Sequence, residues 1–399
     1  MRLGFYYHIP AIIQLGKIYV PGYLGRFLDE LANNIEHLTL FLHQPNPGEN
    51  VYFDHVLQAG NIDLVRLPQR KSAPYRLLHA KKYTMLIKQH SKNIDALMLR
   101  GPSPLLPSLA NADKSLPIIL MIVGDYLAGI DSLPQPAWRK TLIRLMDTVN
   151  YHEQLKVARR SLVFVNSKIL YEQYDGSARK LIETRTSTLT KDDFFVRENT
   201  CENRPIHLLY TGRMDPAKGL LDMVNALSLL VQQGEDVVLD FVGWPEANSD
   251  ILDQINSTAR QAGVEDRVFY HGYKSVGPEL FAYYKNADIY LIASQASEGF
   301  PRTIWEAMAH CLPVVATRVG SIPNFIEGAA ELVEPRDPTA LAHSIQKLIL
   351  DSELQKKYMA RAFEIAKKNT LETQVGKMSR EINQWVEEKN EKIMALPPL

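Results

Sequence analysis

Two glutamates with seven residues between them are the part of this sequence that most suggests chemistry. Glu298 and Glu306 lie in the stretch SEGFPRTIWEA, residues 297–307. An apolar strand is expected at 288–293 and a largely apolar helix at 302–311, which would bury Glu306 and leave Glu298 in the loop before the helix. A buried carboxylate without hydrogen-bond partners is costly, so Glu306 must have partners.

The turn before that helix is suited to an anion or a polar ligand. Pro301 fits a first helical turn, because proline lacks an N–H that would be unpaired there. Four amides near this helix N-terminus would face the same ligand; they belong to Gly299, Phe300, Arg302 and Thr303. A purely structural arrangement, in which Glu298 caps the helix and Glu306 forms a salt bridge, fits the residues equally well.

A second candidate site follows the strand expected at 206–212. In the stretch TGRMDPAKG, residues 211–219, Arg213 and Lys218 stand in a turn before a helix, where two cations would hold a phosphate or diphosphate. Doubly wound domains bind ligands outside the carboxyl ends of their strands, and Gly212 ends this one. The pattern is neither a Walker A loop nor G-x-G-x-x-G. Solvated surface charge is the alternative interpretation.

Other catalytic patterns are missing from the sequence. It has no Asp-x-Asp pair for a metal bound to a diphosphate, no Cys/His cluster with zinc spacing and no G-x-S-x-G elbow. His271 ends the strand expected at 267–271, and a core or loop role is favoured for it over a catalytic one. The sequence therefore predicts no metal site.

Short apolar runs alternate with helical patterns, which is typical of parallel sheets covered by helices on both faces. One series of strands is expected at 2–7, 37–42, 62–67, 95–100, 117–123 and 162–166, and a second at 206–212, 237–243, 267–271, 288–293 and 313–317. A polar segment ending in proline separates the two series, and a long charged helical stretch follows at about 352–394. The sequence predicts an N-terminal domain at 1–197, a linker at 198–205, a second domain at 206–374 and a C-terminal segment at 375–399.

Composition is that of an ordinary soluble globular protein. Lys plus Arg and Asp plus Glu each number 45, so the formal net charge is zero, and no basic patch interleaved with aromatics suggests nucleic-acid binding. Two cysteines in dissimilar contexts, Cys201 and Cys311, fit a reducing compartment. No run of about 18 apolar residues and no signal-peptide pattern is present. We therefore expect a cytoplasmic protein.

Basic residues are densest at 66–93. The segment is either a solvated helix face or a docking surface for anionic lipid or an anionic acceptor. The second interpretation would make the protein peripheral at the inner face of a membrane.

Three segments in order give the chain its resemblance to glycosyltransferase family 4. They are TGRMDPAKG at 211–219, RVFYHGY at 267–273 and SEGFPRTIWEAMAHCLPVVAT at 297–317, the last being similar to the family's paired-glutamate signature. The resemblance implies the α/β GT-B fold: two doubly wound Rossmann-like domains facing a central cleft, with the final helix crossing back to the N-terminal domain. It also implies transfer of a sugar from a nucleoside diphosphate sugar to an acceptor hydroxyl, with retention of anomeric configuration.

The resemblance implies roles for individual residues. Arg213 and Lys218 would hold the donor diphosphate and stabilise the leaving group without a metal ion. Glu298 would hydrogen-bond to hydroxyls of the donor sugar and Glu306 to those of the ribose, which would supply the partners that its burial demands. Tyr273 would lie against the nucleobase. The remaining donor-binding positions are Gly212, Gly299, Phe300, Pro301, Arg302 and Thr303.

Two positions in the N-terminal half are matched more loosely. Gly16 with Lys17 is the best counterpart of the family's glycine-containing loop near the donor phosphates. Asp125, in IVGDYLAG, stands roughly where the family often has a catalytic histidine, and would either assist the acceptor hydroxyl as a base or cap a turn. Cys311 replaces the glycine that usually ends the signature helix, so the left-handed cap lacks its usual residue.

The expected partners are a nucleotide-sugar donor and a glycan, glycolipid or other hydroxyl acceptor, with no cofactor and no nucleic acid. Cell-surface polysaccharide or glycolipid assembly is the expected context. Two alternatives stay open: another GT-B enzyme, such as a nucleotide-sugar epimerase or a phosphorylase, and a catalytically inactive nucleotide-sugar-binding protein.

Overall fold

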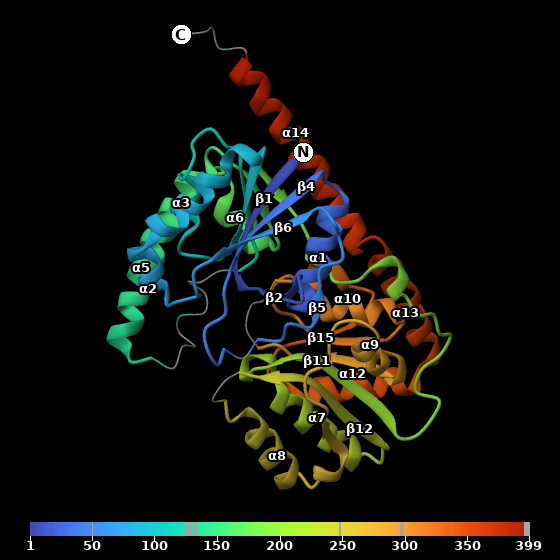
Figure 1. Ribbon diagram of the computed structural model, residues 1–399. Helices are drawn as coiled ribbons and strands as arrows, with labels where there is room; N and C mark the ends of the chain where they lie inside the picture. Colours follow the sequence, from blue (N-terminus) through green and yellow to red (C-terminus); the bar gives the residue numbers. More distant parts are fainter. Residues whose placement is uncertain (50, 125–129, 131–134, 247–248, 296–298, 395–399) are drawn as a thin grey trace. The chain divides into compact units, whose positions relative to one another are not determined.

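The computed structural model describes residues 1–49, 51–124, 130, 135–246, 249–295 and 299–394 (Figure 1). The chain divides into two compact units. The first comprises Met1–Arg185 and Glu372–Leu399, and the second comprises Thr186–Leu371. Each unit is an α/β sandwich, and each is described by itself below.

The first unit is built on a parallel sheet, seven-stranded in the described residues, with the order β10-β9-β8-β7-β1-β4-β6. Its strands are β1 (Arg2–Pro10), β4 (His37–His43), β6 (Ile62–Leu67), β7 (Ala96–Gly101), β8 (Ile118–Ile122), β9 (Leu162–Val165) and β10 (Lys180–Glu183). Its helices are α1 (Gly22–Asn33), α2 (Ala73–Leu78), α3 (Ala80–His90), α4 (Leu106–Ala110), α5 (Ala137–Ala158), α6 (Lys168–Tyr174) and α14 (Leu371–Met394). Helices α3, α4, α5 and α6 share one apolar core with β7, β8 and β9.

The second unit contains a parallel sheet, six-stranded where the chain is described, with the order β13-β12-β11-β14-β15-β16. Its strands are β11 (Ile206–Met214), β12 (Val237–Pro245), β13 (Val268–Tyr270), β14 (Ile289–Ile292), β15 (Val314–Thr317) and β16 (Glu331–Val333). Its helices are α7 (Leu220–Gln232), α8 (Ile251–Gln261), α9 (Pro278–Asn286), α10 (Arg302–Ala309), α11 (Ile322–Ile326), α12 (Pro338–Leu350) and α13 (Ser352–Lys367).

Both faces of the second sheet are covered, as continuous apolar strands require. Helices α7, α8 and α12 form one core with β11 and β12. Helices α9, α10, α11 and α13 form the core on the opposite face. The strands expected from the sequence are therefore confirmed in type and nearly in extent. The helical stretch expected at about 352–394 is two helices, because residues 368–370 interrupt it between α13 and α14.

A small antiparallel sheet, which the sequence did not lead us to expect, follows β1. It joins β2 (Ile12–Gln14), β3 (Lys17–Val20) and β5 (His55–Val56). Leu15 and Gly16 form the two-residue turn between β2 and β3, with φ angles of 48° and 74°. Such turns need a left-handed backbone at both positions, which accounts for the glycine. Gly16 thus lies at the tip of a hairpin.

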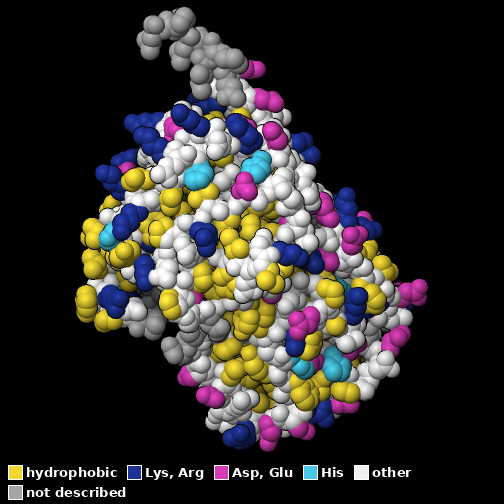
Figure 2. Space-filling model, viewed as in Figure 1, with side chains coloured by type: hydrophobic (Ala, Val, Ile, Leu, Met, Phe, Trp, Pro, Cys, Tyr) yellow, Lys and Arg dark blue, Asp and Glu magenta, His cyan; other side chains and the backbone are white. Residues whose placement is uncertain are grey.

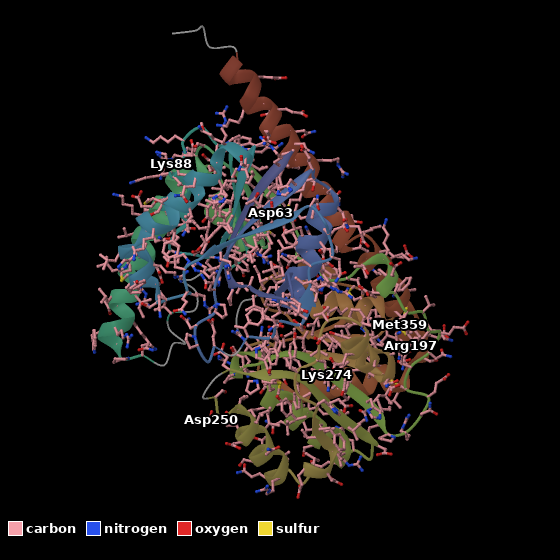
Figure 3. The ribbon with its side chains drawn as sticks, viewed as in Figure 1. Asp63, Lys88, Arg197, Asp250, Lys274 and Met359 are labelled. Atoms are coloured by element: carbon pink, nitrogen blue, oxygen red, sulfur yellow. The ribbon has the colours of Figure 1, made fainter. Side chains whose placement is uncertain are left out.

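The segment expected to be a linker, 198–205, is packed on the second unit. Arg197, which is labelled in Figure 3, lies just before this segment. It donates hydrogen bonds to the carbonyls of Tyr284, Lys285 and Ala287 at the end of α9. The amide of Cys201 donates to Asp288. Polar composition and a proline suggested a free linker, but these contacts fix the segment, and the division between units falls earlier, between Arg185 and Thr186.

Helix α14 makes its contacts in the first unit. Lys180 and Glu381 form an ion pair of 2.6 Å between Nζ and Oε2. The amide of Arg185 donates to Gln374 Oε1. The described helices include none that is both long enough and apolar enough to cross a bilayer.

Candidate functional site

The topology of the second sheet points to one place for a ligand. From β11 the chain adds β12 and β13 on one side, and then crosses to β14 on the other side. Where the loops after two neighbouring strands run in opposite directions, a crevice opens at the carboxyl ends of those strands. Ligands of doubly wound sheets bind in that crevice. The loops after β11 and β14 carry the two motifs that stood out in the sequence.

Close backbone packing brings these two loops together. Gly219, with a φ of 67°, ends the short 3₁₀ turn Pro216–Lys218 after β11. A Cβ atom on Gly219 would lie 2.0 Å from the carbonyl oxygen of Ala293, at the end of β14. The amide of Gln295 donates to the carbonyl of Ala217 at 2.8 Å. The loop after β11, residues 215–219, and the segment after β14, residues 293–295, therefore form one surface.

Arg213 stands at the end of β11 and its side chain is half-exposed. Its guanidinium pairs with Glu246 at 2.7 Å and with Asp215 at 3.0 Å. Asp215 also accepts from the amide of Ala217, which shapes the turn. Lys218 is half-buried in that turn. The structure thus places Arg213 near the end of β11, held between two carboxylates, and Lys218 in the turn that follows the strand.

An aromatic pair closes one side of this loop, and sequence reasoning found only one of its members. Tyr273 packs edge-on against Trp244, with ring centroids 5.3 Å apart. Gly243 lets the strands approach, because a Cβ there would lie 1.7 Å from the Gly212 carbonyl oxygen. Trp244 is 37% exposed. An aromatic residue directly after a strand-ending glycine was the signal that could have identified it.

The segment before α10 is anchored by its own side chains. Phe300 is buried, packs on Trp305 with ring centroids 4.1 Å apart and meets Phe325 edge-on. Pro301 is the residue before the helix, which begins at Arg302 and has no side-chain cap at its described N-terminus. The ring of Phe300 is therefore part of the core, so only the backbone of Phe300 is left for the predicted ligand contact.

Glu306 is 3% exposed, as expected, but its partners come from the chain itself. Thr188 donates to Oε1 at 2.6 Å and the hydroxyl of Tyr284 donates to Oε2 at 2.8 Å. Burial, together with the Glu306 charge, raises the pKa of Tyr284 well above its usual value. Two hydroxyl groups of the chain thus supply hydrogen bonds that the burial of Glu306 requires, and an additional hydrogen bond to a ribose stays a prediction.

Helix α10 ends in a left-handed turn despite lacking glycine. Cys311 has a φ of 50°. The amide of Leu312 donates to the Ala307 carbonyl and that of Cys311 to the Met308 carbonyl, which is the Schellman pattern. The left-handed cap for which a glycine was expected is thus formed here with a buried cysteine.

His271 belongs to a structural group beside the site. Asp240 accepts from His207 Nδ1 at 2.8 Å and from His271 Nε2 at 2.6 Å. Burial alone would raise the pKa of Asp240, but the two hydrogen bonds outweigh it and the pKa is lowered. The hydrogen bond to Asp240 raises the pKa of His207. A loop role for His271, favoured from the sequence, agrees with this geometry.

Two predicted residues, Glu298 and Asp125, lie outside the described residues. Gly212 and Gly299 lie in the two loops at the crevice, whereas Gly16 is at the tip of the β2–β3 hairpin in the first unit. Within the described part of the chain, no group of three or more His, Cys, Asp or Glu side chains is arranged to hold a metal ion.

Comparisons with known proteins match the second unit most closely. The family model described as "Glycosyl transferases group 1" matches residues 191–365. An amylovoran biosynthesis glycosyltransferase of Erwinia amylovora is 29% identical over 178 residues, 43% of this chain and 42% of that protein. An N-acetyl-alpha-D-glucosaminyl L-malate synthase of Bacillus anthracis is 25% identical over 353 residues, 86% of each chain. The match to the Erwinia relative thus spans less than half of that relative.

Solved structures share the fold over nearly the whole chain. Anabaena HepE in complex with UDP has a TM-score of 0.72 and 18% identity, covering 97% of this chain and 100% of that one. WaaG, a glycosyltransferase of lipopolysaccharide biosynthesis, has a TM-score of 0.67 and 14% identity, covering 94% and 98%. Residues 191–365 are therefore similar to the glycosyltransferase group 1 model, and the solved structures show that the fold of the chain is GT-B.

Proposed function

We propose that this protein transfers a sugar from a nucleoside diphosphate sugar to an acceptor hydroxyl. Arg213 and Lys218 bind the donor diphosphate, and the first turn of α10 lies beside them and favours the same negative charge. As the bond to the leaving group breaks, these groups stabilise the charge that develops on the diphosphate. Trp244 and Tyr273 form the aromatic wall for the nucleobase.

One observation carries this proposal: the loop that ends at Gly219 packs directly on Ala293 and Gln295. We infer that the two cations and the start of α10, whose described N-terminus has no side-chain cap, line the same crevice of the second sheet. The names of related proteins support the same class of donor, since HepE structures hold UDP and UDP-glucose. Polysaccharide and lipopolysaccharide assembly, which the names of two relatives mention, is the context we propose.

The finer chemistry follows from the family resemblance and the charges in the crevice. We propose retention by a front-side route, which needs no protein nucleophile, and charge stabilisation without a metal ion. Glu298 binds a hydroxyl of the donor sugar, Glu306 binds the ribose, and Asp125 takes the acceptor proton. Gly16 with Lys17 is proposed to approach the donor phosphates.

A panel of nucleoside diphosphate sugars, followed by thermal shift, tests donor binding, because a ligand that binds only the native state raises its stability by mass action. We expect one nucleotide to raise the melting temperature of the wild type and to lose most of that effect in Arg213→Gln. Arg260→Gln, which removes a cation at the end of α8, is the matched control. A panel without any stabilising nucleotide would refute the donor assignment.

Product analysis separates transfer from the alternatives. A transferase releases nucleotide slowly without acceptor and makes a glycoside with it, whereas an epimerase converts the donor alone. Binding without turnover on every acceptor would indicate an inactive binding protein. Activity should survive EDTA, and a strict requirement for added metal would contradict the proposed charge stabilisation by Arg213 and Lys218.

We also propose that the first unit contacts an anionic membrane. Within the basic 66–93 segment, Leu78 is 83% exposed and Met85 is 52% exposed. Helix α5 adds an exposed apolar stripe on one face, with basic neighbours at its start. Figure 2 shows yellow and dark blue side chains intermingled over α2, α3 and α5. The stripe consists of Trp138, Leu142, Leu145 and Val149, and its basic neighbours are Arg139, Lys140 and Arg144.

Exposed apolar side chains among cations are typical of helices that lie in a membrane interface. Co-sedimentation with anionic vesicles should therefore be strong for the wild type, and weaker with neutral vesicles or in high salt. The double substitution Trp138→Ser, Leu145→Ser should reduce it. Leu350→Ser removes an equally exposed leucine from α12 and should leave it unchanged. Equal binding by all three proteins would refute this contact.

A further inference from the structure

The first sheet has its own switch point, and buried cations gather there. From β1 the chain adds β4 and β6 on one side, and then crosses to β7 on the other. His8 and Arg100 lie near the carboxyl ends of β1 and β7, and His43 ends β4. Arg76, on α2, is close enough for its charge to lower the pKa of both histidines. These four residues form the carboxyl-edge cluster.

The two arginines of the cluster are almost completely buried and incompletely paired. Arg76 is 6% exposed and Arg100 is 7% exposed. In the described structure, Nε and Nη1 of Arg76 and Nε of Arg100 have no hydrogen-bond partner. The Arg100 guanidinium lies over the rings of Tyr7, at 4.7 Å, and Phe27, at 5.4 Å. Ring faces compensate a buried cation only in part, so three N–H donors are left without an acceptor.

No described carboxylate pairs with either arginine. Among the described residues of this region, Glu49 forms its ion pair with Arg70. Removing a guanidinium from water without a counter-charge is strongly unfavourable. Two such groups at one edge therefore favour the binding of an anion that the described residues do not supply.

The histidines of the cluster contribute neutral hydrogen-bonding groups. Burial, reinforced by neighbouring arginines, lowers the pKa of His8 to about 3, and burial lowers that of His43 to about 4. His43 Nδ1 lies 2.8 Å from the carbonyl of Pro68, so Nδ1–H donates there and Nε2 has a free lone pair. The cluster thus offers donors for an oxyanion and an acceptor for a hydroxyl group.

We propose that the carboxyl-edge cluster binds the acceptor through a phosphate group, with Arg76 and Arg100 as its ligands. The identification of the ligand as the acceptor rests on the proposed glycosyl transfer, whereas the binding of a phosphate group does not. Three unpaired N–H donors match the oxygens of a phosphate better than the two oxygens of a carboxylate. The phosphate belongs either to a free sugar phosphate or to a lipid headgroup.

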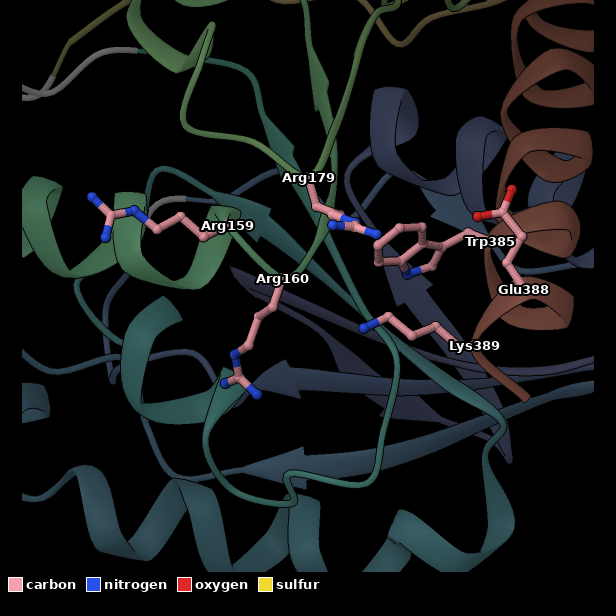
Figure 4. Close-up of a pocket in the computed structure, with 6 residues that line it drawn as sticks. All are labelled: Arg159, Arg160, Arg179, Trp385, Glu388 and Lys389. Carbon is pink, nitrogen blue, oxygen red and sulfur yellow. The ribbon is translucent and has the colours of Figure 1, made fainter. Parts of the chain in front are cut away.

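A basic pocket at the opposite, amino edge of the same sheet supplies the control. Its cavity of about 240 Å³ is lined by Arg159, Arg160, Arg179, Trp385, Glu388 and Lys389 (Figure 4). Arg159 and Arg179 are exposed, so water already solvates their charge. Replacing Arg179 removes the same positive charge from the unit as replacing Arg76, but not a buried one.

Calorimetric titration of the full chain with inorganic phosphate and with glycerol 3-phosphate tests the proposal, with acetate as the carboxylate comparison. The titrations use Arg213→Gln, Lys218→Gln as the background, so that the donor loop does not contribute. Arg76→Met and Arg100→Met should each weaken phosphate binding about tenfold or more, since a hydrogen bond to a charged group is lost. Arg179→Met should leave the affinity unchanged.

Stability separates ligand binding from a structural role. Met fills much of the arginine volume without the buried charge, so Arg76→Met should keep or raise the melting temperature of the ligand-free protein. A lowered melting temperature with unchanged phosphate affinity would make the arginines structural and overturn the proposal. Equal phosphate affinity in wild type, Arg76→Met and Arg179→Met would do the same.

A competition experiment identifies whether the phosphate comes from a lipid headgroup or from a free sugar phosphate. Vesicles of phosphatidic acid in a neutral lipid are compared with glycerol 3-phosphate. Competition between the two indicates a lipid headgroup, and binding of the soluble probe alone indicates a free sugar phosphate. Nucleotide binding is measured on proteins with an intact donor loop, so a failed donor assignment and a failed phosphate assignment give different results.

Discussion

At the scale of single residues, Cys311 carries a backbone conformation that favours glycine. A residue with a side chain at a φ of 50° costs about 1–2 kcal/mol relative to glycine. Cys311→Gly removes that strain but also a small buried side chain. We therefore expect the free energy of unfolding to stay within about 1 kcal/mol of the wild type.

Cys311→Val is the informative partner of that substitution. A β-branched residue is a genuine outlier in the left-handed region, so this variant should lose more than about 2 kcal/mol. Urea denaturation measures both. An equal loss in the two variants would mean that burial, rather than the left-handed turn, decides the stability at this position.

The pair of His207 and Asp240 makes stability depend on pH. The hydrogen bond to Asp240 raises the pKa of His207 in the folded state. A raised histidine pKa contributes stability that is complete below the unfolded value of about 6.5 and is lost as the pH rises through the folded pKa. His207→Gln should therefore flatten the fall in stability above about pH 6.5. Urea denaturation at several pH values checks this, and an unchanged slope would contradict it.

At the candidate site, the burial of Glu306 could be predicted from residue types, but its hydrogen-bond partners could not. Glu306 was expected to be buried and in need of hydrogen bonds, and it is. Its donors, Thr188 and Tyr284, are distant in sequence, so no local pattern could name them. The amide of Phe300 was assigned to the ligand, and this assignment stays a prediction; its ring belongs to the core, a role that the sequence did not indicate.

At the scale of elements, one glycine decides how the two donor loops meet. A Cβ on Gly219 would lie 2.0 Å from the backbone of Ala293, which cannot move without shifting the end of β14. Gly219→Ala should therefore cost more than the roughly 1–2 kcal/mol of a left-handed alanine and should also weaken nucleotide binding.

Gly234→Ala is the matched control for that substitution. Gly234 has a φ of 90° and nothing within 4 Å of the added Cβ. It should show the backbone cost alone and keep nucleotide affinity. If thermal unfolding and nucleotide titration give the same result for both alanines, contact with Ala293 does not position the loop.

Most strands of the two parallel sheets were predictable because they are short, largely apolar runs. Strands β10 and β16 were not predicted, because they are short and their side chains are mostly half-buried. The β2–β3–β5 sheet was not, because its strands have two to four residues and half-exposed or exposed side chains. The segment 198–205 was misjudged for a related reason. Its polar residues are tied down by hydrogen bonds from Arg197 and Cys201, and composition does not reveal such contacts.

At the scale of the whole molecule, the two units have separate apolar cores. Each should therefore respond to its own ligand. In differential scanning calorimetry we expect two transitions, of which the nucleotide raises one and glycerol 3-phosphate the other. A single transition raised equally by both ligands would show that the units unfold together.

The division of the chain has a practical consequence for making its parts. Thr186–Leu371 is one uninterrupted stretch of sequence, whereas the first unit is assembled from Met1–Arg185 and Glu372–Leu399. In genetic terms the second unit is an insertion into the first. A gene fragment for residues 186–371 encodes a whole unit. Truncation after residue 185, in contrast, deletes α14 and removes Glu381, the ion-pair partner of Lys180. A fragment of the first unit requires the two coding segments to be rejoined by a designed linker.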